Sequence, residues 1–199
     1  MNLQTYIDKS ISYHAYREWV DTLKEEGKTS GPEQKEDLIY FTGLNAQRMK
    51  RLDKTFRLLP DILPTLRGLS QSYLWLVITE SWCGDAAQVL PILNALAQQT
   101  DKIELLTVFR DENPELMDAF LTNDTRSIPK LIIIEKESGN VAASWGPRPS
   151  AAQDLVVAYK ENSEEESYVD FQARLQLWYT KDKGAHTLAE LQEVLDSLS

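Results

Sequence analysis

The stretch SWCGDAAQVLPIL, residues 81–93, holds the only cysteine of the chain, Cys83, and directly follows the apolar run YLWLVITE, residues 73–80. A near-continuous run of apolar, β-branched and aromatic residues is typical of a strand buried on both faces of a parallel sheet. Beyond the cysteine, apolar residues recur at helical spacing as far as Gln99, and Pro91 is expected to bend that helix or remove one of its hydrogen bonds. Cys83 is therefore expected where a strand passes into a helix.

The alternation of strands and helices continues after this helix. The patterns predict a strand over 102–109, a short helix opened by Asn113 and Pro114, two strands within 127–146 joined by a turn at 138–140, and a helix capped at Ser150. The predicted order is β-α-β-α-β-β-α over about residues 73–161. Two adjacent strands joined by a short turn, next to strands joined by helices, predict a mixed sheet.

The segments on either side of this region read as helical. Apolar spacing predicts a helix over 10–26 that stops at Gly27, a second from Pro32 to about Arg57, and a short third within 60–69. Near the C-terminus, Ser163 with Glu166 and Thr187 with Glu190 form capping-box patterns that predict two more helices. We expect a helical extension (1–70), a central α/β domain (71–161) and C-terminal helices (162–199), packed as one compact unit.

Composition excludes several classes of partner. The 199 residues include 21 Lys and Arg against 31 Asp and Glu, a formal net charge of −10, which would repel a nucleic acid or an anionic membrane. No stretch has the roughly 18 apolar residues of a spanning helix, and the first residues lack a basic run followed by an apolar one. A single cysteine cannot form an internal disulfide, so we expect a cytoplasmic protein.

Three local sequences resemble the thioredoxin family. SWCGDA (81–86) stands where thioredoxins carry Trp-Cys-Gly-Pro-Cys, followed by a proline eight residues after the cysteine. RSIPKLIII (126–134) resembles the loop in which that family holds a cis proline facing the thiol, which would make Pro129 the cis residue, preceded by Ile128. SGNVAASWG (138–146) resembles the last hairpin. The resemblance implies an α/β thioredoxin fold with a mixed central sheet, and the patterns described above add an N-terminal helical extension and extra C-terminal helices.

Two departures from thioredoxins change the chemistry that the resemblance implies. The position of the second cysteine holds Ala86, so a disulfide cannot close within the chain. The buried acid of the family would fall at Val77, which cannot move a proton. RDENPELMDAFLTNDTRSIPKLI (110–132) and the helical extension resemble a bacterial thioredoxin-like family that lacks the standard dithiol.

The expected pKa of Cys83 depends on opposing influences. A thiol just before a helix meets backbone N–H groups and the positive end of the helix dipole, which lower the pKa from about 8.5. Asp85 and Glu80 lie close in sequence, and a neighbouring negative charge raises it. The sign of the shift stays open. Asp85 replaces the proline of the family motif and is expected to cap the helix by accepting from backbone N–H groups.

The first hypothesis is a monothiol oxidoreductase. Cys83 would attack a protein or peptide disulfide, and an external thiol such as glutathione would resolve the mixed disulfide, with no resident cofactor. The expected groove consists of Trp82, Gly84, Asp85, Ile128 and Pro129, and this hypothesis predicts a lowered thiol pKa.

The rival hypothesis is a binding module that uses the same groove for an extended peptide, in which Cys83→Ser would leave function intact. A glutathione transferase relative is disfavoured, because about seventy helical residues precede the central domain and only about fifty residues follow it.

Four further residues are candidates for a supporting role, namely Ala86, Glu80, Arg110 and Arg126. Arg110 and Asp111 follow the second strand, at the edge where α/β sheets collect ligands, and would also make a strand-end ion pair. Arg126 is expected to pair with Asp124 or Asp111 if it does not contact substrate.

Features elsewhere in the chain have simpler readings. The basic run Arg48, Lys50, Arg51, Lys54 and Arg57 is expected to be a solvated helix face, with an acidic protein partner as the alternative. His14 and His186 lack a second ligand at helical spacing, so no metal site is expected. The aromatic residues of the flanking helices are expected to pack on the sheet, or to form the interface of a homo-oligomer.

Overall fold

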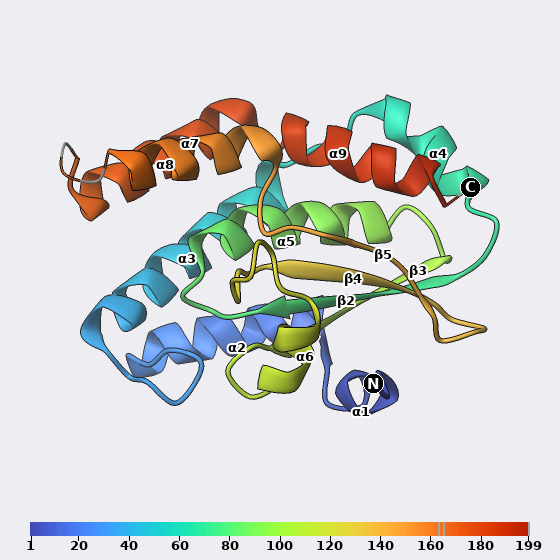
Figure 1. Ribbon diagram of the computed structural model, residues 1–199, viewed down its shortest axis with the longest axis horizontal. Helices are drawn as coiled ribbons and strands as arrows, with labels where there is room; N and C mark the ends of the chain where they lie inside the picture. The colour runs from blue at the N-terminus through green and yellow to red at the C-terminus, as the bar shows by residue number, and fades with distance from the viewer. Residues whose placement is uncertain (163, 165, 199) are drawn as a thin grey trace.

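The computed structural model of the protein describes residues 1–162, 164 and 166–198 (Figure 1). Within these residues five strands form one mixed sheet in the order β1-β3-β2-β4-β5. The parallel pair β2 and β3 lies at its centre, and β1, β4 and β5 are antiparallel to their neighbours. The strands are β1 (Ile11–Ser12), β2 (Tyr73–Thr79), β3 (Ile103–Phe109), β4 (Lys130–Glu135) and β5 (Val141–Trp145).

Helices cover both faces of the sheet. They are α1 (Gln4–Ile7), α2 (Tyr13–Glu26), α3 (Glu36–Thr55), a 3-10 turn η1 (Pro60–Ile62), α4 (Leu63–Gly68), α5 (Gly84–Ala97), α6 (Pro114–Ala119), α7 (Ser150–Glu161), α8 (Tyr168–Asp182) and α9 (Ala185–Asp196). Figure 1 shows α5 on one side of the sheet with α4, α7, α8 and α9 beyond it, and α2 and α6 on the opposite side. The predicted α/β architecture with extra helices at both ends is confirmed.

The apolar run after residue 72 forms the most buried strand. Every residue of β2 is buried, because it pairs with β3 on one edge and with β4 on the other while helices cover both faces. The strand ends at Thr79, and the chain turns through Glu80, Ser81 and Trp82 into α5. Cys83 therefore lies at the carboxyl end of the central parallel strand, where open α/β sheets collect ligands.

Several helix boundaries differ from the predictions. The second long helix begins at Glu36 rather than at Pro32. The predicted cap at Ser150 is wrong: Pro149 is the N-cap residue of α7, and the Ser150 hydroxyl donates to the Glu190 carboxylate instead of accepting from the helix. The capping box at Thr187 is wrong, since α9 already begins after Gly184 and Glu190 is held by Ser150 and Trp145.

At the other predicted capping box, Ser163 lies outside the described residues, and Ser167 caps α8 by accepting from the Asp170 N–H. The short elements α1 and β1 were not predicted, because four and two residues are too few for a periodic pattern.

The apolar core joins segments that are far apart in the chain. One cluster of buried side chains includes Tyr16 of α2, Met49 of α3, Trp75 of β2, Leu93 of α5 and Leu191 of α9. The helical extension and the last helix thus share a core with the sheet. A second, smaller cluster lies between α7 and α8 and consists of Ala152, Val156, Phe171, Leu175 and Tyr179. In the described part of the chain, no helix combines the length and the apolar character needed to span a bilayer.

Candidate functional site

Cys83 is the N-cap residue of α5 and has an extended backbone. Its sulfur accepts a hydrogen bond from the Ala86 N–H at 3.5 Å and donates one to the Ile128 carbonyl at 3.2 Å. The peptide bond between Ile128 and Pro129 is cis, so the thiol lies beside the loop that the sequence placed opposite it. Only 8% of the Cys83 surface is exposed.

Burial, followed by the charge of the Asp85 carboxylate, raises the pKa of Cys83 to about 12, because the Ala86 N–H and Arg148 offset only part of these two effects. Desolvation penalises the thiolate more than one backbone donor stabilises it. The direction of the pKa shift of Cys83, which the sequence left open, is therefore upward. The lowered pKa predicted by the oxidoreductase hypothesis is wrong.

Asp85 does not cap α5. The sulfur of Cys83 occupies the capping position, and the Asp85 carboxylate turns toward residues from the C-terminal part of the chain. It accepts two hydrogen bonds from Arg148, at 2.9 Å from Nε and 2.5 Å from Nη2, and one from the Tyr179 hydroxyl at 2.7 Å. Asp85 is therefore a buried ion-pair residue beside the thiol, and the predicted cap is wrong.

Glu80 is fully buried at the end of β2. Its carboxylate accepts hydrogen bonds from the Ser30 hydroxyl and from the Asp111 N–H, the latter at 2.9 Å. Burial raises the pKa of Glu80 to about 7, although both hydrogen bonds favour the charged form. The Tyr16 hydroxyl donates to the Glu80 carbonyl. These contacts tie Glu80 to the helical extension and to the end of β3.

A cluster of buried hydroxyl groups also connects the loop after β2 to the helical extension. The Ser81 hydroxyl lies within hydrogen-bond distance of those of Thr29, Ser30 and Thr42, and Asn45 donates to the Ser81 carbonyl at 2.9 Å. The strand-to-helix loop is thereby fixed to the segment that precedes and begins α3. Sequence reasoning missed these residues, because buried serines and threonines carry no pattern that separates them from exposed ones.

A pocket of about 370 Å³ opens beside the thiol. The predicted residues on its wall are Trp82, Cys83, Gly84, Asp85, Ile128, Arg110 and Arg126. Pro129, Ala86 and Glu80 are not among its lining residues. Ala86 and Glu80 are fully buried, and Pro129 is buried under Gly146, where an added Cβ would meet the Pro129 carbonyl oxygen. The other wall was not predicted and comes from Asp37, Leu38 and Phe41 at α3, Ser127, Arg148, and Tyr168 and Gln172 of α8.

Three arginines contribute to this pocket. Arg110 lies over the Trp82 ring, with 4.7 Å from its guanidinium carbon to the ring centre, and also pairs with Asp111 at 2.8 Å. Arg126 pairs with Asp118 through two hydrogen bonds of 2.7 Å, so the partners predicted for it, Asp124 and Asp111, are wrong. The third is Arg148. Three cationic side chains therefore line this pocket, although the protein as a whole carries a negative net charge.

Among the described residues no group of His, Cys, Asp and Glu has the arrangement of a metal site. His14 pairs with Glu18 and His186 with Asp182, each one turn away on its own helix.

Comparison with known proteins agrees with this geometry. A family model described as Thioredoxin matches residues 31–166, from the segment before α3 to the segment before α8. Thioredoxin 1 of Nostoc sp. (strain PCC 7120) is 38% identical over 55 residues, which are 27% of this chain and 49% of that protein. Thioredoxin 1 of Synechococcus elongatus is 36% identical over the same shares. The chain therefore spans about half the length of these curated relatives.

Two solved structures resemble the fold. An HIV epitope scaffold (4E10) has a TM-score of 0.64 at 16% identity, with all of both chains covered. A protein of unknown function from Pseudomonas aeruginosa has a TM-score of 0.54 at 19% identity, covering 80% of this chain and 86% of that one. At these identities the two structures bear on the fold alone. With the family match over most of the sheet and its helices, the chain belongs to the thioredoxin family, as a member whose motif retains one cysteine.

Proposed function

We propose that the pocket beside Cys83 binds an extended, acidic segment of a partner protein, and that Cys83 serves there as a neutral thiol rather than as a redox nucleophile. The observation that carries this proposal is the state of the sulfur: it is buried, it donates to the Ile128 carbonyl, and its pKa is raised to about 12. At pH 7 such a thiol is ionised in on the order of 10⁻⁵ of the molecules. Disulfide exchange requires the thiolate, so this state opposes exchange.

The backbone beside the cis proline supports binding of an extended chain. The Ile128 carbonyl already accepts from Cys83, whereas the Ile128 N–H has no hydrogen-bond partner among the described residues. A peptide strand laid along this edge would supply a carbonyl to that donor, as in recognition by strand addition. The side chains of Trp82 and Phe41 would contact its alternate residues.

The charge of the pocket supports an acidic segment. Arg148 is held in the ion pair with Asp85. Arg110 and Arg126 lie at the mouth of the pocket, where each pairs with one acid near the surface of the protein, Asp111 and Asp118 respectively. Surface pairs of this kind contribute about 0–1 kcal/mol, so a ligand carboxylate can replace either acid at low cost. The guanidinium of Arg110, which lies over the Trp82 ring, also matches the planar geometry of a carboxylate.

The proposal is tested by titrating the full chain with the labelled hexapeptide Glu-Val-Glu-Val-Glu-Val and with its Gln-Val counterpart, following fluorescence anisotropy. The acidic peptide should bind at least tenfold more tightly, and Arg110→Gln should remove most of that difference. Arg67→Gln on α4, which removes the same charge from an exposed site away from the pocket, is the control. Cys83→Ser should bind the peptide within about twofold of the unaltered chain. Equal affinity for both peptides, or loss of binding in Cys83→Ser, would overturn the proposal.

The second candidate is a monothiol oxidoreductase, favoured by one contact, the hydrogen bond from the Ala86 N–H to the sulfur at the start of α5. In that reaction the Cys83 thiolate forms a bond to one sulfur of a substrate disulfide and releases the other as a thiolate. A second, external thiol such as glutathione then attacks the mixed disulfide and frees Cys83.

A pH profile of alkylation by iodoacetamide separates the two candidates. A rate that stays high down to about pH 7 supports the oxidoreductase, because the thiolate must then be the resting form. A rate that is negligible at pH 7 and still rising above pH 10 supports the binding protein. The chain unfolded in urea is the control and should show the ordinary midpoint near 8.5.

A further inference from the structure

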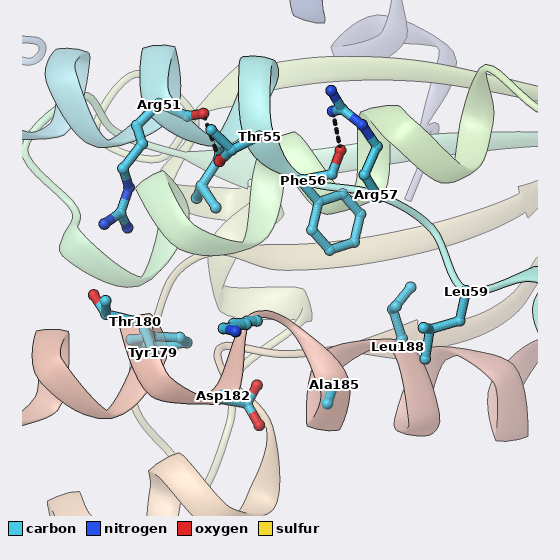
Figure 2. A pocket seen from close by; sticks show the side chains of 12 residues that line it. Arg51, Thr55, Phe56, Arg57, Leu59, Tyr179, Thr180, Asp182, Ala185 and Leu188 are labelled. Carbon is cyan, nitrogen blue, oxygen red and sulfur yellow. Dashed lines mark hydrogen bonds between the residues drawn. The ribbon is translucent and has the colours of Figure 1, made fainter.

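A second cavity, separate from the thiol pocket, lies between the end of α3 and the turn that joins α8 to α9. It has a volume of about 620 Å³. Figure 2 shows Phe56 and Arg51 reaching from α3 toward α8, and Leu59 close to Leu188 of α9. A volume of this size lies within the range of small-molecule sites, about 300–1,000 Å³.

The interior of this cavity is apolar. Its lining includes Leu52, Phe56, Leu59, Tyr179 and Leu188. Leu59 is 56% exposed. Contact between this side chain and an apolar ligand would be favourable, because it would remove apolar surface from water. The two threonines of the lining, Thr55 and Thr180, donate their hydroxyls to carbonyls of their own helices. The lining therefore offers apolar contact and few free polar groups.

The rim carries positive charge without matching acids. Arg51 and Lys183 line the cavity, and neither has an ion-pair or hydrogen-bond partner for its side chain among the described residues. Asp182, the acid of the lining, is held by His186. Arg57 donates to the carbonyls of its own segment, and in Figure 2 its guanidinium points away from Leu188.

A smaller hollow of about 290 Å³ adjoins the cavity and shares Arg51 and Thr180 with it. Arg48 lines this hollow one turn before Arg51, and burial together with the Arg51 charge lowers its pKa. The buried Gln176 side chain also lines it, and its amide nitrogen has no partner in the described residues. Arg48 donates to the Asn45 side chain at 2.8 Å, so Arg51 and the Gln176 amide are the donors of this hollow that have no partner in the described residues and are available to an anionic group.

We propose that this cavity binds a medium-chain aliphatic carboxylate, with its chain over Phe56, Leu59 and Leu188 and its head group at Arg51. The volume of about 620 Å³ and the apolar lining suit a single aliphatic chain, and the unpaired cations suit one negative charge. A peptide would bury backbone groups that the lining cannot satisfy, because both threonine hydroxyls are already committed. This site is independent of the function proposed for the thiol pocket.

The proposal is tested by isothermal titration of the full chain with hexanoate, octanoate and decanoate below their micelle concentrations, and with decanol. The affinity should rise roughly tenfold for every two added methylenes until the cavity is filled. Decanol should bind at least tenfold more weakly than decanoate, because it lacks the charge that pairs with Arg51.

Two variants and a control locate the site. Arg51→Gln should weaken decanoate at least tenfold and leave decanol unchanged, whereas Leu59→Gln should weaken both ligands. Lys54→Gln removes the same charge from an exposed position of α3 that does not line the cavity, and should change neither. Leu59 and Arg51 are exposed, so both variants should fold, which circular dichroism checks.

Three outcomes would overturn the proposal. They are equal binding of decanol and decanoate, an unchanged affinity in Arg51→Gln, and a dimer in sedimentation velocity that Leu59→Gln dissociates. The last would assign the cavity to a second copy of the chain.

Discussion

Cys83 receives one backbone hydrogen bond at the start of α5, yet it lies under Ile128 and next to the Asp85 carboxylate. Asp85 in turn is held by Arg148 and Tyr179, which come from segments more than sixty residues further along the chain. The state of the sulfur therefore depends on side chains that its own motif does not contain. A thioredoxin motif with one cysteine can thus hold a thiol whose pKa is raised rather than lowered.

Replacing Asp85 by Asn separates the charge of this residue from its hydrogen bonds. We expect the pKa of Cys83 to fall, because a negative charge that raises it is removed, so iodoacetamide should react faster at pH 8. The change should also lower the free energy of unfolding by about 2–4 kcal/mol, because Arg148 is left without its buried partner. The matched control is Asp118→Asn in the exposed pair with Arg126, expected to cost under about 1 kcal/mol in urea denaturation. An unchanged alkylation rate in the Asp85 variant would contradict the electrostatic account.

Because the pKa of Glu80 is raised, its contribution to the free energy of unfolding decreases as pH rises. A carboxylate in an ion pair, whose pKa is lowered, has the opposite effect. The pKa of Glu80 is about 7 in the folded chain and near 4.5 when unfolded, so between these values the folded state binds more protons. The Glu80 contribution to the free energy of unfolding therefore falls as pH rises from 4.5 to 7, by about 3 kcal/mol in all. Glu80→Gln should remove this decline, since glutamine stays neutral and can still bond to Ser30 and Asp111. Urea denaturation at pH 5 and pH 7.5 measures the decline in the free energy of unfolding. An equal decline in the unaltered chain and in Glu80→Gln would exclude Glu80 as the source of the decline.

The turn between α8 and α9 shows how one residue sets the distance between helices. Gly184 has φ of 84° and precedes α9, and a Cβ added to it would lie 2.6 Å from Ile92 and 2.9 Å from Phe56. Glycine there permits both the left-handed backbone and the close approach of the turn to α5 and α3. This approach also forms one wall of the apolar cavity.

Gly184→Ala should therefore destabilise the chain more than Gly27→Ala. Gly27 ends α2 with φ of 64°, but nothing lies within 4 Å of the added Cβ, so only the backbone strain of about 1 kcal/mol applies. Gly184→Ala adds overpacking of about 1–3 kcal/mol. The two midpoints of urea denaturation give the comparison, and equal losses would mean that the turn is not tightly packed.

Taken together, the helices and the sheet divide into two packed regions of unequal size. The main core includes side chains of α2, α3, α5 and α9 and of the sheet, whereas α7 and α8 pack largely through the small cluster of Phe171, Leu175 and their neighbours. Tyr168 and Val169, at the start of α8, are exposed. Local opening costs least where few apolar contacts are lost.

Native-state hydrogen exchange should thus divide the chain along this line. The amides of α7 and the first half of α8 should exchange through openings of lower free energy than those of β2 and α5. The helical extension should exchange with the main core, because Tyr16 and Met49 belong to it and Ser81 is bonded to Thr42. Protection of α7 equal to that of β2, or early exchange throughout α2 and α3, would contradict this division.

Local patterns were enough to predict the central strand, the helix after it and the hairpin that follows. These elements depend on runs of apolar residues and on Gly and Pro, whose conformational limits act within a few residues. The caps at Ser150 and Thr187 were predicted wrongly. Ser150 is the first residue of α7 rather than its cap, and Glu190 is held by Trp145 and Ser150 from other elements. Capping patterns are short enough to occur where another partner takes the same side chain.

The sequence by itself determined that a strand would deliver one cysteine to the start of a helix, with no second sulfur to form a disulfide. Only the tertiary structure decided the direction in which the pKa of Cys83 is shifted, the ion pair of Asp85 with Arg148, and the proximity of Glu80 to Ser30. The physical reason is one of range. Backbone conformation follows from neighbouring residues, whereas desolvation and charge pairing depend on which distant segments exclude water from a group.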